Sequence, residues 1–406
     1  MTNNQHPIDV EVIETYYGAV LKSRVGEINV TTSHPEKRNR EAMTDFAAWY
    51  FLPVGMRLNA ALRIEGRGTR QTVANFRRIS EIWQSWLPGH FYATDVSFAE
   101  LNSRPTDVSH QNPGRDLLYF SGGLDAAYTA LARLRDGRRQ DLLTIHGMDY
   151  SLSDTAGFEA LLGKTRAFAE ELSDTRIVVK TDAYALYNKL KVNLKRHHLS
   201  HVFALAGAGF FHSSTYQNLI LAADERLDGQ FLHFPWGTNS ATDHLFDDGR
   251  TKLITADDNL TRSEKLELIL NSKTALNSLA FCWNRKIQPE NCGHCRKCLL
   301  TKMMFLAATG SVPDIFQNQS IPSDWATRLR YRDPAGFHAV QEIFNSALAL
   351  GHTRKIPNFT KTYEDVFGFY RRLRAIQESK FVAYNSRWMR SAINKLASIG
   401  KVYRPR

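Results

Sequence analysis

The chain has 406 residues with 43% hydrophobic and 23% charged side chains, which is ordinary for a globular protein with a sizeable core. The formal net charge is +11. No run approaches the roughly 18 apolar residues of a membrane span, and the first ten residues are polar, so we expect a cytoplasmic protein with no membrane partner.

Residues 1–110 are predicted to form an N-terminal α+β extension. Short β-like runs such as residues 24–30 accompany two helical segments, residues 45–51 and 69–86. In the second segment, apolar side chains at helical spacing predict a core-facing stripe formed by Val73, Phe76, Ile79, Trp83 and Trp86. Pro105, Pro113 and Gly114 mark residues 102–115 as a linker.

Strands and helices alternate after the linker, which predicts an α/β domain with a parallel sheet and right-handed crossovers. The expected strands are residues 117–120, 142–146, 177–180 and 219–222. Expected helices follow Asp125 and cover residues 158–172 and 201–211. Ligands of such sheets bind at the carboxyl ends of the strands, so the residues that follow each strand are site candidates.

A glycine-rich turn follows the first expected strand and reads Ser121-Gly122-Gly123-Leu124-Asp125. Its backbone N–H groups and the start of the next helix predict a phosphate-binding site, and the two glycines allow close approach to the anion. The Asp125 carboxylate would repel phosphate, so its expected role is to hold Mg²⁺ or a cationic neighbour. The same pattern also occurs in ordinary turns.

Further candidates follow the other strands. His146 and Gly147 end the second strand, where His146 either touches a ligand or is a hydrogen-bonded strand end. Thr181 and Asp182 follow the third strand and either face a ribose or cap a helix. The polar loop after the fourth strand is a substrate candidate in which a ring would stack on an indole; its residues are Trp236, Gly237, Thr238, Asn239 and Asp243.

Arg262 and Lys265 are one helical turn apart and would suit a polyphosphate. Glu264 lies between them in the sequence, which favours a surface helix as the alternative.

All four cysteines fall in one short stretch, and their spacing is that of a structural zinc site: Cys282, Cys292, Cys295 and Cys298. Two disulfides are the alternative, but such crowding would strain them. Four thiolates leave no open position for water, so we expect the Zn²⁺ to be structural.

The net charge is concentrated at the C-terminal end. Residues 325–406 contain 16 Lys and Arg against 5 Asp and Glu, an excess that equals the whole formal charge. Residues 363–376 and 386–399 both have helical patterns, the first with Phe367 and Tyr370 on one face. This region is either a solvated helical cap or a surface that binds nucleic acid or an acidic protein.

The glycine turn and the cysteine motif together resemble the PP-loop ATP pyrophosphatase superfamily, and within it 7-cyano-7-deazaguanine synthase. The resemblance covers roughly residues 116–310 and extends to relatives with a longer N-terminal extension, a loop like residues 235–238, and an Arg-x-x-Lys such as Arg262 and Lys265. It implies a parallel-sheet PP-loop (HUP-like) domain at residues 111–310 that carries a zinc-binding insertion. A helical basic region would follow at residues 311–406.

The resemblance also implies an activity. ATP is cleaved to AMP and pyrophosphate, and AMP activates a carboxylate, here a 7-deazaguanine-type or other small acid. Ammonia or an amine, including one on a protein, then displaces AMP. Ser121, Asp125 and Lys265 would serve the phosphates together with Mg²⁺, and His146 and Gly147 would face the base. Relatives of the synthase also occur in bacterial anti-phage gene clusters, which implies a role in defence.

One position departs from the family pattern. The residue after the motif's aspartate is usually Ser or Thr, and here it is Ala126, so one hydroxyl donor to the phosphates is missing. A hydrogen bond to a charged group contributes about 1.5–3 kcal/mol, which is enough to slow an enzyme. Two alternatives therefore stay open: a tRNA-modifying member of the superfamily, and a nucleotide-binding scaffold with weak turnover.

Overall fold

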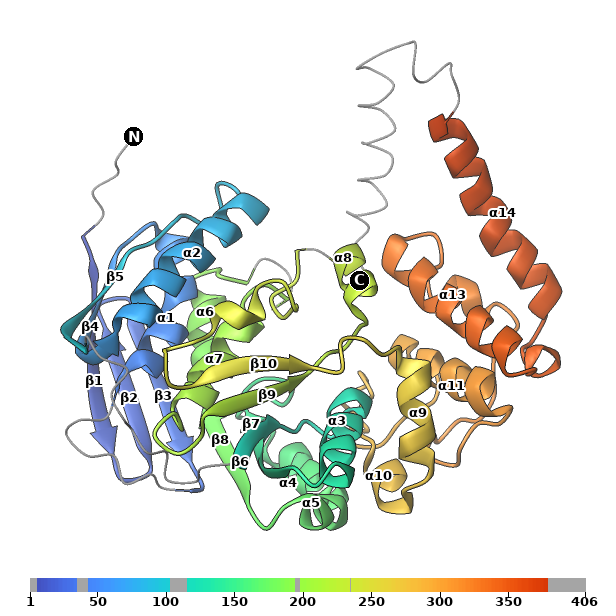
Figure 1. Cartoon of the computed structure of the whole chain (residues 1–406), viewed down its shortest axis with the longest axis horizontal. Coiled ribbons are helices and arrows are strands. Elements are labelled where there is room, and N and C mark those ends of the chain that lie inside the picture. The colour runs from blue at the N-terminus through green and yellow to red at the C-terminus, as the bar shows by residue number, and fades with distance from the viewer. Residues whose placement is uncertain (1–5, 35–42, 103–114, 194–197, 234, 379–406) are drawn as a thin grey trace. The chain divides into compact units, whose positions relative to one another are not determined.

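The computed structural model describes residues 6–34, 43–102, 115–193, 198–233 and 235–378 (Figure 1). The chain divides into two compact units. The first unit consists of Met1–Leu227, Phe234–Leu260 and Leu268–Ala280. The second consists of Asp228–His233, Thr261–Glu267 and Phe281–Arg406.

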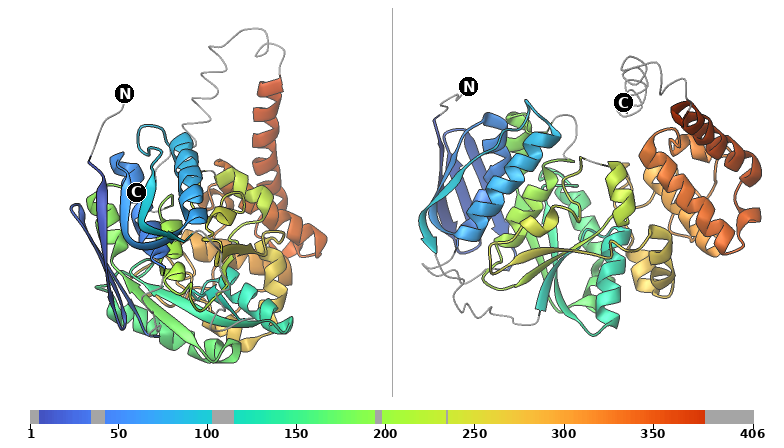
Figure 2. Two further views of the ribbon diagram at one scale, coloured as in Figure 1. Left: turned by 60° about the vertical axis from the view of Figure 1, so that its left-hand side comes forward. Right: turned by 45° about the horizontal axis from the view of Figure 1, so that its top comes forward.

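The first unit is built on a single ten-stranded sheet with the order β10-β9-β6-β7-β8-β3-β2-β1-β4-β5. Figure 2 shows the chain from two further directions. The strands are β1 (Ile8–Thr15), β2 (Gly18–Ser23), β3 (Gly26–Thr32), β4 (Leu62–Thr69), β5 (Val96–Asn102), β6 (Arg115–Tyr119), β7 (Arg139–His146), β8 (Arg176–Thr181), β9 (Asn218–Ala222) and β10 (Lys252–Ala256).

The sheet is mostly parallel, which confirms the predicted α/β class. The strands β6 to β10 run parallel to one another, and β1, β4 and β5 form a second parallel group. The two groups are joined by antiparallel pairings, among them β3 with β8, where Val30 lies opposite Thr181. The strands β1 to β5, which lie within the predicted N-terminal extension, therefore continue the central sheet. Of the linker predicted at residues 102–115, residues 103–114 lie outside the described part of the chain.

Helices of the first unit cover the sheet. On one side α3 (Leu124–Arg135) packs against α5 (Arg166–Leu172), which also contacts α10 (Lys273–Ser278). In the other group, α7 (His201–Phe210) packs against α1 (Asp45–Leu58), which contacts α2 (Arg70–Trp86) and α6 (Ala183–Lys189). Right-handed crossovers explain why the helices form two groups. The chain moves along the sheet in one direction from β6 to β8 and in the opposite direction from β8 to β10.

The predicted helix at residues 158–172 is two helices, α4 (Thr155–Lys164) and α5, which meet at Thr165. The Thr165 hydroxyl donates to the carbonyl oxygen of Leu161 at 2.7 Å. Such a bond back to the preceding turn bends a helix, and here the helix breaks at that residue.

The helices α1 and α2 differ in how much of their surface is buried in the core. Every residue of α1 from Asp45 to Met56 is buried, since the helix is apolar around its whole circumference. In α2 the predicted stripe is confirmed, because Phe76, Ile79 and Trp83 are buried and its remaining members pack against the core.

The second unit is helical. Its elements are α8 (Leu227–His233), the start of α9 (Arg262–Leu270), α11 (Arg296–Thr309), α12 (Trp325–Arg328), α13 (Pro334–Ala349), η2 (Thr353–Lys355) and α14 (Phe359–Glu378). Aromatic rings join α13 to α14, as Phe344 packs on Tyr363 and Phe337 on Tyr370. The predicted helix at residues 363–376 is thus part of α14, and the one at residues 386–399 lies outside the described residues. Among the described helices, none combines the length and apolarity needed to cross a bilayer.

Candidate functional site

The turn between β6 and α3 carries the predicted phosphate site. Gly123 is the N-cap of α3 and has no side chain to cap the helix. Its N–H donates to the Ser121 hydroxyl at 3.3 Å. The Ser121 side chain is exposed, and Asp125 lies half-buried in the first turn of the helix. Helix starts present N–H groups that lack partners within the helix, so this turn can offer several donors to one anion.

Gly122 is required by the backbone of this turn. Its φ of +77° lies in the left-handed region, and a Cβ there would come within 3.0 Å of the Thr165 methyl group. Its carbonyl oxygen accepts a hydrogen bond from the N–H of Ala280 at 2.8 Å. The turn is therefore held in one conformation by two other segments of the first unit.

The strand order places this turn where the sheet reverses direction. The chain passes from β6 through β7 to β8 on one side, and later places β9 and β10 on the other side of β6. In open parallel sheets the crevice for ligands lies at the carboxyl ends of the two strands that flank such a reversal. The glycine motif had already marked the turn after β6 in the sequence, and the strand order adds that it lies where the sheet reverses direction.

The residues after the second and third strands make structural contacts. The His146 ring is 2% exposed and stacks on Phe158 at 4.2 Å, and its Nε2 lies 2.8 Å from the carbonyl oxygen of Ser151. Gly147 allows the chain to pass close to β8, because a Cβ would lie 1.8 Å from the Thr181 carbonyl oxygen. These contacts are those of the hydrogen-bonded strand end, and base binding by His146 and Gly147 stays a prediction.

Asp182 was expected either to face a ribose or to cap a helix. It precedes α6, but its side chain does not cap that helix. Instead the carboxylate accepts hydrogen bonds from the backbone and side-chain nitrogens of Asn29 at 2.7 and 2.8 Å. Asp182 therefore ties β3 to the end of β8. Thr181 is buried and accepts from the N–H of Ala183 at 3.3 Å.

The predicted substrate loop is organised around Asn239. Its amide nitrogen donates to the Trp236 carbonyl oxygen at 2.9 Å, and its side-chain oxygen accepts from the N–H of Thr242 at 3.1 Å. Helix α8 separates this loop from β9 in the chain, so the loop does not follow the fourth strand directly.

Two histidines that the sequence argument missed lie against this loop. The His198 ring stacks on Trp236 with a centroid distance of 5.8 Å, and His201 Nε2 lies 3.0 Å from the Thr238 hydroxyl. The N–H of Gly237 donates to the His198 carbonyl oxygen at 2.6 Å. Their closeness in the sequence was the available signal, since His198 lies three residues before His201, the first residue of α7.

Asp243 is a buried acid in η1 (Asp243–Leu245). Its Oδ2 accepts from the Thr255 hydroxyl at 2.7 Å, whereas its Oδ1 has no hydrogen-bond partner among the described residues. Burial raises the pKa of Asp243 to about 7, and the charge of Asp224 adds to the effect. Asp243 also helps raise the pKa of Tyr119, the last residue of β6, so this loop lies near the strand that leads into the glycine turn.

Arg262 and Lys265 lie on α9 in the second unit, whereas the glycine turn belongs to the first. The surface-helix alternative is wrong for Lys265, whose side chain is fully buried. Glu264 is exposed and accepts from the N–H and hydroxyl of Thr261, each at 2.7 Å, which makes it part of the helix cap. A role for Arg262 and Lys265 at the phosphates stays a prediction.

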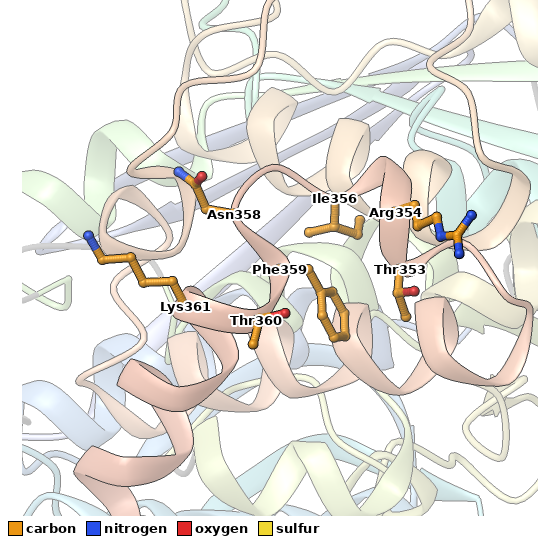
Figure 3. Close-up of a pocket in the computed structure, with 7 residues that line it drawn as sticks. All are labelled: Thr353, Arg354, Ile356, Asn358, Phe359, Thr360 and Lys361. Carbon is orange, nitrogen blue, oxygen red and sulfur yellow. The ribbon is translucent and has the colours of Figure 1, made fainter.

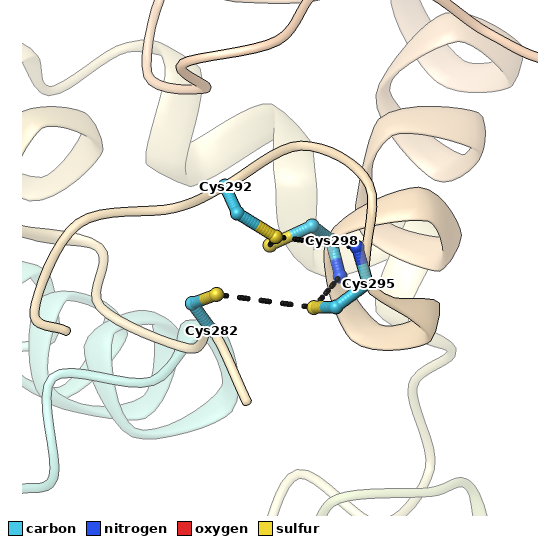
Figure 4. A group of neighbouring side chains, drawn as sticks. All are labelled: Cys282, Cys292, Cys295 and Cys298. Carbon is cyan, nitrogen blue, oxygen red and sulfur yellow. Dashed lines mark hydrogen bonds between the residues drawn. The ribbon is translucent and has the colours of Figure 1, made fainter. Parts of the chain in front are cut away.

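The four cysteines gather at the start of α11, and their sulfur atoms all lie within 4.8 Å of one another (Figure 4). The Sγ atoms of Cys282 and Cys295 are 3.9 Å apart, and so are those of Cys292 and Cys298. A zinc tetrahedron with Zn–S bonds of about 2.3 Å has edges of about 3.8 Å, so the cluster can bind a metal such as zinc. None of the four forms a disulfide.

Backbone donors and mutual charge favour a cation in this cluster. N–H groups of Asn284 and Cys295 donate to Cys282 Sγ and Cys292 Sγ at 3.3 and 3.2 Å. Burial raises the pKa of Cys282 to about 11, while the hydrogen bond with Cys298 lowers the pKa of Cys295 to about 4 and raises that of Cys298. Ionisation of one thiol thus disfavours ionisation of its neighbour, and a bound divalent cation would offset this repulsion between thiolates.

A pocket of about 350 Å³ lies between η2 and the start of α14 (Figure 3). It is lined by Thr353, Arg354, Ile356, Asn358, Phe359, Thr360 and Lys361. It contains none of the predicted site residues and no acid, cysteine or histidine.

Comparisons with protein-family models, with curated proteins and with solved structures give no match to this chain.

Proposed function

We propose that this chain is an ATP-dependent adenylating enzyme of the PP-loop type that joins a small carboxylic acid, of the 7-deazaguanine type or similar, to ammonia or an amine. The supporting observation is the glycine turn at the carboxyl end of β6, in the position where the strand order reverses. The cysteine cluster supports it independently, since a tetrathiolate zinc site accompanies this turn in the synthase that the sequence resembles.

Charge development explains the roles of the turn. When pyrophosphate leaves, negative charge grows on its oxygens, and the N–H groups of residues 121–125 and the Ser121 hydroxyl stabilise that charge. Asp125 is the carboxylate available to hold Mg²⁺, which would neutralise part of the phosphate charge. The zinc site has only a structural role in this proposal.

The loop around Trp236 would bind the acid. Its polar groups would orient the substrate and the indole would stack on a ring. An attacking amine loses a proton as it displaces AMP, and Asp243 Oδ1, whose pKa is raised to about 7, suits the role of acceptor.

The decisive experiment measures pyrophosphate release from Mg²⁺-ATP with candidate acids, together with ATP binding by calorimetry. The proposal predicts acid-dependent release that a Ser121→Ala/Asp125→Ala double variant abolishes. Asp136→Ala, an exposed position at the other end of α3, is the matched control and should behave like the parent. Absence of ATP binding by the parent, with the double variant unchanged in every assay, would overturn the proposal.

A scaffold with weak turnover is the second candidate, and Ala126 favours it. This residue is buried in the first turn of α3, where the family pattern has a hydroxyl. If the missing donor limits catalysis, Ala126→Ser should raise turnover roughly tenfold while ATP affinity changes less. Measured ATP binding without hydrolysis, and no gain from the serine, would support the scaffold instead.

A further inference from the structure

Arg176, the first residue of β8, is a half-buried cation that the sequence argument did not single out. Burial lowers its pKa to about 10. Within the described part of the chain no carboxylate pairs with it, and its Nη2 has no hydrogen-bond partner. A partly buried charge without a counterion is costly, so something outside this set of contacts is expected to compensate it.

The guanidinium contacts the segments that hold the glycine turn. Its Nε donates to the Thr144 hydroxyl at 3.0 Å, and that hydroxyl donates to the Phe120 carbonyl oxygen at 2.8 Å. Its charge also lies 5.5 Å from the centre of the Phe120 ring. Phe120 is the residue directly before Ser121, so these contacts fix the chain as it enters the turn.

A second set of contacts reaches the middle of the turn. Nη1 donates to the Thr165 hydroxyl at 2.8 Å, and the methyl group of the same threonine closes the space beside Gly122. The break between α4 and α5 at Thr165 thus places one side chain between the arginine and the turn. All these partners are neutral, so the full positive charge of Arg176 remains beneath the turn.

We propose that Arg176 is a positioning residue and the fixed countercharge for a polyphosphate anion bound by residues 121–125. It acts through Thr144, Thr165 and Phe120 without touching the ligand. Negative charge on the ligand would compensate the cation, which favours a triphosphate or pyrophosphate over an uncharged nucleoside. The inference rests on the proposed nucleotide site and assigns the source of its charge selectivity.

The test compares ligands of different charge on matched variants. Arg176→Met removes the charge, Arg176→Lys keeps it, and Arg133→Met removes a buried arginine, which pairs with Asp116 in the same unit. Calorimetry gives the dissociation constants of Mg²⁺-ATP, AMP and adenosine for each protein. We expect Arg176→Met to weaken ATP binding roughly tenfold and adenosine binding less than about twofold, since the effect is Coulombic. Arg176→Lys keeps the charge but cannot make both hydroxyl contacts, so it should retain the preference for ATP over adenosine, and Arg133→Met should leave the ratio of ATP to adenosine affinity unchanged.

Several outcomes would overturn the inference. Equal loss of ATP and adenosine binding in Arg176→Met, an unchanged ATP affinity, or the same ATP-selective loss in Arg133→Met would each show a structural role only. If Arg176→Met does not fold, loss of the preference for ATP over adenosine in Arg176→Lys would contradict the inference.

Inorganic pyrophosphate separates the two proposals. A thermal shift of the parent by pyrophosphate that disappears in Arg176→Met, without any acid-dependent release of pyrophosphate from ATP, would retain the inference and reject the proposed enzyme. If neither ATP nor pyrophosphate binds to the parent, both fall.

Discussion

Gly122 meets two constraints at once, a left-handed backbone and a space that Thr165 closes. Gly137, at the other end of α3, has a similar φ of +72°, but a Cβ there would have nothing within 4 Å. Comparing substitutions at the two glycines therefore distinguishes the effect of backbone strain, which both positions share, from the effect of the steric contact, which only Gly122 has.

We predict that Gly122→Ala abolishes ATP binding, whereas Gly137→Ala costs only the backbone strain of roughly 1 kcal/mol. Calorimetry with Mg²⁺-ATP and urea unfolding of both variants check this. Retained ATP affinity in Gly122→Ala would mean that the conformation of this turn does not matter for binding.

Asp243 links stability to pH. Its pKa is raised to about 7 in the folded chain against an ordinary value of 3.8, because burial disfavours the anion. Between these values the folded state holds a proton that the unfolded state has released, so this residue's contribution to stability falls as pH rises from about 4 to about 7. The total loss is roughly 4 kcal/mol.

Asp243→Asn should therefore be more stable than the parent at pH 8 and lose that advantage by pH 4. The measurement is the difference between the two free energies of unfolding across this range. A difference that is independent of pH would show that Asp243 ionises normally. Thr255 retains an acceptor in the variant, because the asparagine oxygen can replace the carboxylate oxygen.

At the scale of elements, the amino ends of the central strands are joined by a buried ionic network. Asp141 in β7 is 2% exposed, pairs with Arg115 of β6, and accepts from the hydroxyls of Tyr216 at 2.7 Å and Ser173 at 3.1 Å. These contacts hold β6 and β7 in register at the end opposite to the glycine turn. They serve the fold and leave the carboxyl ends available for chemistry.

Asp141→Ala should lower the free energy of unfolding by about 3–5 kcal/mol, since it leaves Arg115 without its buried partner. Asp95→Ala is the control, because Asp95 pairs with Arg77 at the surface with both side chains at least half exposed. That change should cost at most about 1 kcal/mol. Equal losses in urea unfolding would contradict the assigned burial of the Asp141 pair.

At the scale of the whole molecule, the two units differ in what stabilises them. The first has a ten-stranded sheet with a continuous apolar core. The second is helical and begins, in its main segment, at the cysteine cluster. Where metal ligands come together only on folding, the free energy of zinc binding contributes to the stability of the folded state. Metal removal should therefore destabilise the second unit more than the first.

We expect one Zn²⁺ per chain by metal analysis, and loss of hydrogen-exchange protection in residues 281–310 on chelation, with β6 to β8 largely unaffected. Cys298→Ser should lose the metal. His294→Ala should keep it, because this exposed histidine lies outside the four-sulfur cluster. Uniform loss of protection throughout the chain, or no bound metal, would contradict this division.

The sequence by itself determined the local features. The strands expected at residues 117–120, 142–146, 177–180 and 219–222 correspond to β6, β7, β8 and β9, because short apolar runs and the turns between them are local signals. The cysteine spacing likewise predicted the cluster, since residues a few positions apart cannot separate far.

Only the tertiary structure decided the rest, because it depends on which distant segments meet. The pairing of β3 with β8 joined strands β1 to β5 to the central sheet, and the strand order placed the glycine turn where the sheet reverses direction. The burial of Lys265 and the position of Arg176 beneath the glycine turn are also long-range results. Periodicity reports which face of an element is apolar, and it carries no information about the partner that covers that face.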